Sequence, residues 1–323
     1  MDLQEYNYNL PPELIAQSAV HPHDHCRLLI IKDHFEHKQF YQIIDYLEKG
    51  DILVINDSKV RRCKLSGTKS TGGKVEAVLL KQIAHLTYQT RIKGRNLKSG
   101  TTLLFPNNSG TIVSLHEDLF EIKFAREPQD EELELLTPSY IKNKIPEEDY
   151  QTIYAQQASS LAAPTAGLHF TAELLKKIEE KSIKIAKIQL DISFATFLPI
   201  RDLEHHSTGK ESFSIDEKNA AIINSGNIIA VGTTVVKCLE SAHWQNGKVL
   251  PTSGDSEIFI KPGHQFQAPI KALITNFHLP KSSLLLLTAA YTGRERLLKA
   301  YEEAVKQKYR FFSLGDAMMI FRE

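Results

Sequence analysis

The feature that most constrains the fold is a change of pattern along the chain. Residues 51–55 predict a buried strand, and short apolar runs then alternate with turn residues from about 65 to 124. From residue 149 onward, strand patterns alternate with helical ones, which is typical of an α/β core. The early strand fits that core. We therefore predict an α/β core domain with an inserted small antiparallel β-barrel domain, the core at 1–63 and 148–323 and the insert at 64–147.

The elements expected in each part follow from these patterns. In the insert we predict strands at 74–80, 87–93, 102–105, 111–115 and 119–124. In the second half we predict strands at 183–190, 228–231, 272–275 and 318–321, and helices at 171–181, 216–225, 235–243 and 294–308.

Charge is unevenly spread over the 323 residues, although the formal net charge is zero. Between Ser58 and His116 there are eleven Lys and Arg but one acidic residue, Glu76. Such a basic block favours a polyanionic partner, since it resembles the electrostatic footprint of nucleic-acid binding. The alternative is an ordinary solvated basic surface.

The composition indicates a reduced, cytoplasmic environment. The sequence contains no run of about 18 apolar residues, so it predicts no membrane span. The polar start, Met1–Glu5, is not typical of a secretion signal. The three cysteines, Cys26, Cys63 and Cys238, are odd in number and far apart, which favours free thiols.

A loop of small residues, Leu161–Thr171, is the strongest local candidate for a binding site. Its Ala-Ala-Pro-Thr-Ala-Gly run has no side chains large enough for a core, but lets backbone N–H groups approach a ligand. It carries Thr165 and His169 and precedes a predicted helix, whose N-terminus favours anionic or polar groups. The alternative is a plain Pro-Gly connection.

Three other segments place polar residues at predicted strand ends. Val231–Thr234 joins a strand to a helix, and Ala272–Ser283 runs from a strand into Asn276, His278 and Lys281. Tyr309–Met318 sets Arg310 and Asp316 among aromatics. Ligands of α/β sheets bind at the carboxyl ends of strands. A capped helix and satisfied loop networks are the alternatives.

The histidines of His21–Cys26 and of His205-His206 raise the question of a metal site. Metal binding requires converging ligands supported by neighbouring groups. The spacing does not establish either, so we interpret the first stretch as a polar loop and expect no metal.

These segments together resemble the S-adenosylmethionine:tRNA ribosyltransferase-isomerase family of queuosine biosynthesis, nearly from end to end. The resemblance rests on residues 8–17, 50–57, 71–76, 149–155, 162–171, 231–234, 239–241, 262–263, 274–282, 309–313 and 315–318. It implies the same two-domain fold. It also implies that the ribosyl part of S-adenosylmethionine is transferred to 7-aminomethyl-7-deazaguanine at the tRNA wobble position, with release of adenine and methionine. We expect no cofactor beyond S-adenosylmethionine as co-substrate, and a monomer.

Candidate roles follow from that resemblance. Proton transfer is assigned to His169 and His278, since imidazoles titrate near neutrality, and Asp57 and Asp316 are candidates to face the sulfonium or the substrate amine. Glu240 is a third such acid. The remaining co-substrate candidates are Thr165, Gly167, Gly232, Thr233, Thr234 and Asn276. The candidates for tRNA contact are Lys59, Arg61, Arg62, Lys64, Lys74, Arg91, Lys281 and Arg310.

The chain also departs from the family pattern. Residues His23, Lys59, Lys64, Leu198 and Lys237 stand where arginine is usual, residues 191–197 differ from a His-containing run, and Gly209 replaces a histidine, leaving His206. Lysine lacks the bidentate fork of arginine. The alternatives left open are a relative acting on another acceptor and a non-catalytic RNA-binding protein.

Overall fold

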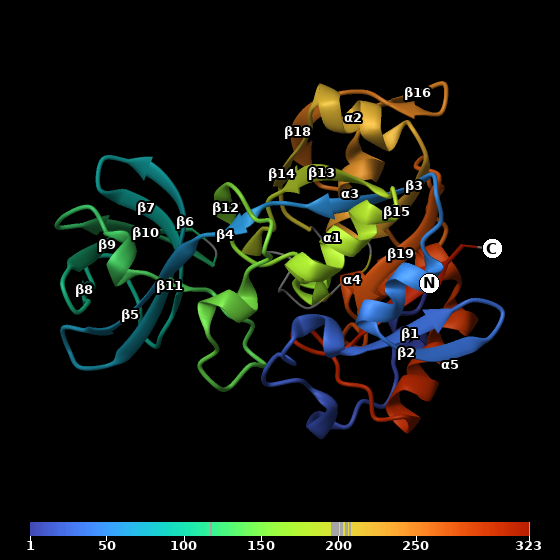
Figure 1. Ribbon diagram of the computed structural model, residues 1–323. Coiled ribbons are helices and arrows are strands. Elements are labelled where there is room, and N and C mark those ends of the chain that lie inside the picture. The colour runs from blue at the N-terminus through green and yellow to red at the C-terminus, as the bar shows by residue number, and fades with distance from the viewer. Residues whose placement is uncertain (117, 195–199, 201–202, 204–205, 207, 323) are drawn as a thin grey trace. The chain divides into compact units, whose positions relative to one another are not determined.

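The computed structural model describes residues 1–116, 118–194, 200, 203, 206 and 208–322. The chain forms two compact units, Met1–Val60 with Pro138–Glu323, and Arg61–Thr137 (Figure 1). The second unit begins three residues before the predicted insert and ends ten residues before it. No helix in the described part of the chain is long and apolar enough to cross a bilayer.

A nine-stranded mixed sheet forms the core of the first unit, in the order β18-β14-β13-β3-β15-β19-β20-β1-β2. The neighbours β13, β3, β15 and β19 run parallel, so their carboxyl ends meet at one edge. The strands are β1 Arg27–Ile31, β2 Phe35–Gln39, β3 Asp51–Asn56, β13 Lys184–Leu190, β14 Glu211–Ile215, β15 Asn227–Val231, β18 Thr252–Ser256, β19 Ile270–Asn276 and β20 Ala317–Phe321.

Helices and 3₁₀ turns cover both faces of this sheet. The α-helices are α1 Ala172–Glu180, α2 Glu217–Ile223, α3 Thr233–Ser241, α4 Ser283–Thr292 and α5 Arg294–Lys306. The 3₁₀ helices are η1 Leu3–Tyr6, η2 Pro12–Leu14, η3 His23–His25, η4 Phe40–Tyr46, η6 Glu147–Tyr150 and η7 Thr165–His169. Two small ribbons complete the unit: β4 Lys59–Val60 with β12 Ala158–Ser160, and β16 Trp244–Gln245 with β17 Lys248–Val249.

Alternation along β3 divides the core into two layers. Ile52 and Val54 pack into one cluster with residues of α2 to α5. Leu53 and Ile55 point the other way and pack with residues of α1 and η4. Because successive strand side chains face opposite sides, a strand such as β3, whose four central residues are apolar, needs cover on both.

The second unit is a closed antiparallel barrel. Its sheet runs β11-β5-β6-β7-β10-β9-β8, and the β5–β8 pairing closes six of these strands into a ring. Leu65, Ala77, Ile112 and Ile122 are among its buried core residues. Closure removes free sheet edges. The strands are β5 Arg62–Lys69, β6 Lys74–Ala84, β7 Thr87–Lys93, β8 Thr102–Leu104, β9 Ser109–His116, β10 Leu119–Phe124 and β11 Glu134–Leu135; η5 is Asp130–Glu132.

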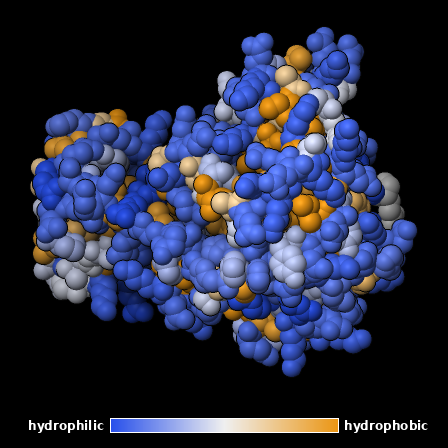
Figure 2. Space-filling view, in the orientation of Figure 1, coloured by the Kyte–Doolittle hydropathy of each residue, from blue (hydrophilic) through white to orange (hydrophobic). Residues whose placement is uncertain are grey.

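The predicted fold class is confirmed, and most predicted elements lie within a few residues of the observed ones. The elements that were not predicted are the hairpin β1–β2, the barrel strand β5, the edge strand β18 with its neighbour β14, the short strands β4, β11, β12, β16 and β17, and helix α4. The molecular face in Figure 2 is mainly hydrophilic with small hydrophobic patches.

Candidate active site

The predicted site segments meet where parallel strands end. Asp57 follows β3, Gly232 follows β15, and Asn276 ends β19, and these three strands are sheet neighbours. The connection from β3 leads to β13 on one side, whereas β15 lies on the other side. Such a topological switch point is where α/β sheets bind ligands.

Asn56 fixes the turn that presents Asp57. The buried Asn56 amide donates to Leu190 O at 2.9 Å, and its Oδ1 accepts from Leu190 N at 3.1 Å and Ser58 N at 3.2 Å. The Asp57 side chain is half-buried, and burial raises its pKa, opposed by Lys187. The carboxylate also accepts a hydrogen bond from its own backbone N–H, and no hydrogen bond joins it to another of the described residues.

The turn before α3 offers backbone donors. Gly232 has φ +93°, a left-handed conformation that favours glycine. It caps α3 without any side-chain hydrogen bond. The first N–H groups of a helix have no partner within it, so those of Thr233 and Thr234 can bind an anionic or polar group.

Three buried hydroxyls in this region have no hydrogen-bond partner among the residues that the structure describes: Thr152 Oγ1, Tyr154 Oη and Thr234 Oγ1. We call them the hydroxyl cluster. A Cβ on Gly167 would lie 2.0 Å from Tyr154 Oη and 2.9 Å from Thr152 Cγ2. A Cβ on Gly232 would lie 3.4 Å from Thr234 Oγ1 and 3.6 Å from Ala166 Cβ. The small-residue loop and the Val231–Thr234 turn are thus packed together.

His169 belongs to a closed hydrogen-bond network. Thr165 Oγ1 donates to Asn276 Oδ1 at 2.9 Å, and Asn276 Nδ2 donates to Phe312 O and to His169 Nε2, both at 3.1 Å. With Nε2 accepting, the neutral ring carries its proton on Nδ1, which faces Cys26 Sγ at 3.2 Å. Burial lowers the pKa of His169 to about 3, with smaller contributions from His23 and Arg310.

His278 is similarly enclosed. Its ring Nε2 lies 3.1 Å from Thr275 Oγ1. Its backbone N–H donates to Tyr301 Oη at 2.9 Å, and its backbone carbonyl accepts from Tyr8 Oη. Burial lowers the pKa of His278 to about 3. Both imidazoles are therefore neutral at pH 7, so their predicted role as proton carriers stays a prediction that this environment does not favour.

The other two candidate acids hold loops in place. Glu240 accepts from Ala268 N at 2.9 Å, Gln267 N at 3.1 Å and His264 Nε2 at 2.9 Å. Asp316 accepts from Arg27 N at 2.9 Å and Arg310 N at 2.7 Å, and burial raises its pKa. No described hydrogen bond joins either carboxylate to the hydroxyl cluster.

Some of the residues predicted to contact tRNA already bind other groups of the protein, and others are exposed. The Arg61 guanidinium donates to Leu79 O and Leu80 O at 2.7 Å each, and Lys64 pairs with Glu134 at 2.9 Å. Arg310 donates to Ser18 O and Leu314 O.

The remaining contacts are more accessible. Lys59 and Lys74 are exposed, and no ion pair of theirs occurs among the described residues. Arg62 is exposed, whereas Arg91 and Lys281 are half-buried, Lys281 in a turn with φ +58°. The barrel unit as a whole carries twelve Lys and Arg against nine Asp and Glu, so the basic block is partly offset within its own unit.

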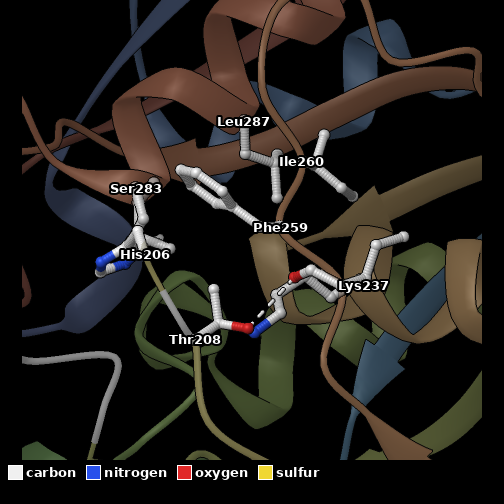
Figure 3. Close-up of a pocket in the computed structure, with 9 residues that line it drawn as sticks. His206, Thr208, Lys237, Phe259, Ile260, Ser283 and Leu287 are labelled. Carbon is white, nitrogen blue, oxygen red and sulfur yellow. Dashed lines mark hydrogen bonds between the residues drawn. The ribbon is translucent and has the colours of Figure 1, made fainter. Parts of the chain in front are cut away.

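A separate pocket lies farther along α3 (Figure 3). Lys237 lines it and pairs with the buried Glu211, and Thr208 Oγ1 donates to Ile258 O at 3.4 Å. The other lining residues are His206, Phe259, Ile260, Ser283, Leu284 and Leu287. None of the predicted site residues lines this pocket. Leu198, His205 and the end of the 191–197 run lie outside the described residues.

Some residues of interest were not assigned from the sequence. Thr152 and Tyr154 lie in a segment that supported the resemblance, but hydroxyl side chains in a loop carry no local signal of burial. Asp149 converges with His21 and His23, a grouping that the spacing of the two histidines did not reveal.

Comparison with known proteins gives a consistent result. A family model described as queuosine biosynthesis protein matches residues 3–320. The S-adenosylmethionine:tRNA ribosyltransferase-isomerase of Desulforamulus reducens is 45% identical, covering 99% of this chain and 100% of the relative. That of Fusobacterium nucleatum is 44% identical, covering 99% and 97%. A crystal structure of S-adenosylmethionine tRNA ribosyltransferase from Thermotoga maritima matches with a TM-score of 0.57 and 32% identity, covering 98% of this chain and 100% of that one.

Proposed function

This chain belongs to the queuosine biosynthesis protein family, and on that premise we propose that it is an S-adenosylmethionine:tRNA ribosyltransferase-isomerase. The acceptor is the aminomethyl group of 7-aminomethyl-7-deazaguanine at the wobble position of tRNA. The ribosyl group of S-adenosylmethionine is transferred and isomerised to the epoxy-cyclopentanediol of epoxyqueuosine, and adenine and methionine leave.

The reaction requires a base. The sulfonium acidifies the neighbouring sugar C–H, so a carboxylate near that carbon can remove the proton. Asp57 fits this task, because its half-buried carboxylate has a raised pKa and no hydrogen bond to another residue in the described part of the molecule. A less solvated carboxylate is a stronger base. This observation carries the proposal of Asp57 as the proton acceptor.

Binding of the co-substrate is assigned to the turn before α3. The N–H groups of Thr233 and Thr234 receive the methionine carboxylate at the positive end of the helix dipole. The hydroxyl cluster supplies partners for the ribose hydroxyls, since buried polar groups without a partner are rare in folded proteins. These three oxygens are enclosed, so we expect the η7 turn to shift when the co-substrate binds.

The two buried histidines act as positioning residues in this proposal. A neutral imidazole with a pKa near 3 is a poor proton carrier at pH 7. His169 instead connects η7 to β19 through Asn276. His278 holds the residues that follow β19.

Release of adenine from S-adenosylmethionine, followed by chromatography, tests the function. We expect release with tRNA that carries the 7-deazaguanine precursor and none with the same tRNA carrying guanine at that position. Release with the free base alone would indicate another acceptor. Tight tRNA binding without any adenine release would indicate a non-catalytic RNA-binding protein and would overturn the proposal.

A further inference from the structure

Two histidines and an aspartate from distant parts of the first unit converge on one point. His21 Nε2 and His23 Nε2 each lie 3.2 Å from the same oxygen, Asp149 Oδ1. All three potential ligand atoms lie within 4.8 Å of one another. His21 and His23 come just before β1, whereas Asp149 lies in η6.

The tautomer of His23 is set by a second contact. Its Nδ1 lies 2.7 Å from Leu168 O, and a carbonyl oxygen can only accept, so Nδ1 carries a proton. In the neutral ring Nε2 then has a lone pair, and that lone pair faces a carboxylate oxygen. Two acceptors 3.2 Å apart are unfavourable, so either a second proton on the ring or a metal ion must lie between them.

The geometry matches the edge of a tetrahedral metal site. With bonds of about 2.0–2.1 Å to imidazole nitrogen and carboxylate oxygen, neighbouring ligands of a tetrahedral zinc ion are roughly 3.3 Å apart. The contact from His23 Nδ1 to a carbonyl is the support that metal-bound histidines typically have. Two imidazoles and one carboxylate favour zinc-type ions over magnesium or calcium, which prefer oxygen ligands.

We propose that His21, His23 and Asp149 form a site for a divalent transition-metal ion of the zinc type. Water takes the fourth position, because the His21 side chain is 64% exposed whereas that of Asp149 is 4% exposed. The ion ties the segment before β1 to η6, and through Leu168 it supports η7 next to Gly167. This inference is independent of the proposed function, because it concerns only the metal and the fold.

Zinc binding to tag-free, metal-stripped protein tests the proposal. Isothermal titration with ZnCl₂ is expected to show one site, and the melting temperature is expected to rise with zinc and to fall again with EDTA. Magnesium is expected to have no such effect. His21→Ala and Asp149→Asn are expected to weaken zinc binding at least about tenfold.

His34→Ala is the matched control. His34 is 72% exposed and lies 3.6 Å from one carboxylate, that of Glu36, so it forms a pair rather than a three-ligand site. This variant is expected to bind zinc as the wild type does. The proposal is overturned if zinc and EDTA leave the melting temperature unchanged, or if zinc binds equally well to His21→Ala and Asp149→Asn. A melting temperature that depends on pH but not on zinc would show that the cluster is only an ion pair, which also overturns it.

Discussion

At the scale of single residues, the Asp57 carboxylate is expected to be needed for catalysis but not for stability. Its carboxylate is half-buried and its pKa is raised by burial, so ionised Asp57 opposes folding at neutral pH. Asp57→Asn is expected to lower the rate of adenine release by about 10²–10⁴-fold, with a melting temperature equal to or above that of the wild type. The measurements are turnover under saturating substrates and a thermal unfolding curve. Near-normal turnover would exclude Asp57 as the base.

The buried histidines predict how stability depends on pH. The pKa of His278 falls from 6.5 to about 3 on folding, as does that of His169, so the unfolded chain binds protons between those values and the folded chain does not. The contribution of each neutral ring to the free energy of unfolding is fully present above about pH 6.5 and is lost as the pH falls toward 3. At pH 5 the loss is about 2 kcal/mol for each ring.

The check is urea unfolding of wild type and His278→Gln at pH 7.5 and pH 5. The variant is expected to be less stable than the wild type at both pH values. Its loss of unfolding free energy between pH 7.5 and pH 5 is expected to be smaller than that of the wild type by about 2 kcal/mol. An unchanged difference would show that His278 is not held neutral in the folded protein.

The sequence could identify which loops carry the site but not which atoms are free. Thr165, His169 and Asn276 were predicted separately and form one network. The spacing of residues could not show that Glu240 and Asp316 accept backbone N–H groups, because those partners come from loops distant in sequence or from folded turns. Nor could it show that, among the described residues, the Asp57 carboxylate has only its own backbone N–H as a hydrogen-bond partner.

At the scale of elements, the turn between β15 and α3 gives a paired test. Thr234 Oγ1 and Thr292 Oγ1 are both buried without a hydrogen-bond partner in the described part of the chain, the first at the start of α3 and the second at the end of α4. Valine has nearly the same shape as threonine without the hydroxyl. Thr234→Val and Thr292→Val are therefore each expected to stabilise the free protein by about 1 kcal/mol.

Affinity for S-adenosylmethionine distinguishes the two variants. Thr234→Val is expected to weaken binding by about tenfold, since it removes a hydrogen bond to the ligand, whereas Thr292→Val leaves binding unchanged. Calorimetric titration measures both. Equal affinities in the two variants would place the co-substrate away from α3.

Element prediction succeeded where periodicity is strong and failed where it is absent. The strands β3 and β13 and the helices α1 and α5 have clear apolar patterns. Helix α4 is apolar on nearly every side because it is buried between neighbours, so it shows no amphipathic period. Strand β18, Thr-Ser-Gly-Asp-Ser, is an edge strand that contributes no large apolar side chain.

At the scale of the whole molecule, the basic residues predict a salt-dependent interaction with tRNA. Lys59 and Lys74 are exposed, whereas the Arg61 guanidinium already binds backbone carbonyls. The double variant Lys59→Ala, Lys74→Ala is expected to weaken tRNA binding and to reduce the slope of log Kd against log salt by roughly 1.5.

Lys218→Ala with Lys248→Ala is the matched control, since it removes the same charge from exposed positions outside the predicted contacts. The two double variants are compared by tRNA binding curves between about 50 and 200 mM salt. This range is less than one decade, but phosphate contacts change the affinity measurably within it. The same slope in both variants would mean that the lysines act through net charge alone.

The central claim is that the co-substrate binds where β3, β15 and β19 end, and a crystal structure with S-adenosylmethionine or an unreactive analogue tests it most directly. The account predicts a ligand whose carboxylate contacts the N–H groups of Thr233 and Thr234, whose ribose contacts the hydroxyl cluster, and whose sulfonium side faces Asp57. A ligand bound instead in the pocket of Lys237 and Phe259 (Figure 3) would contradict it.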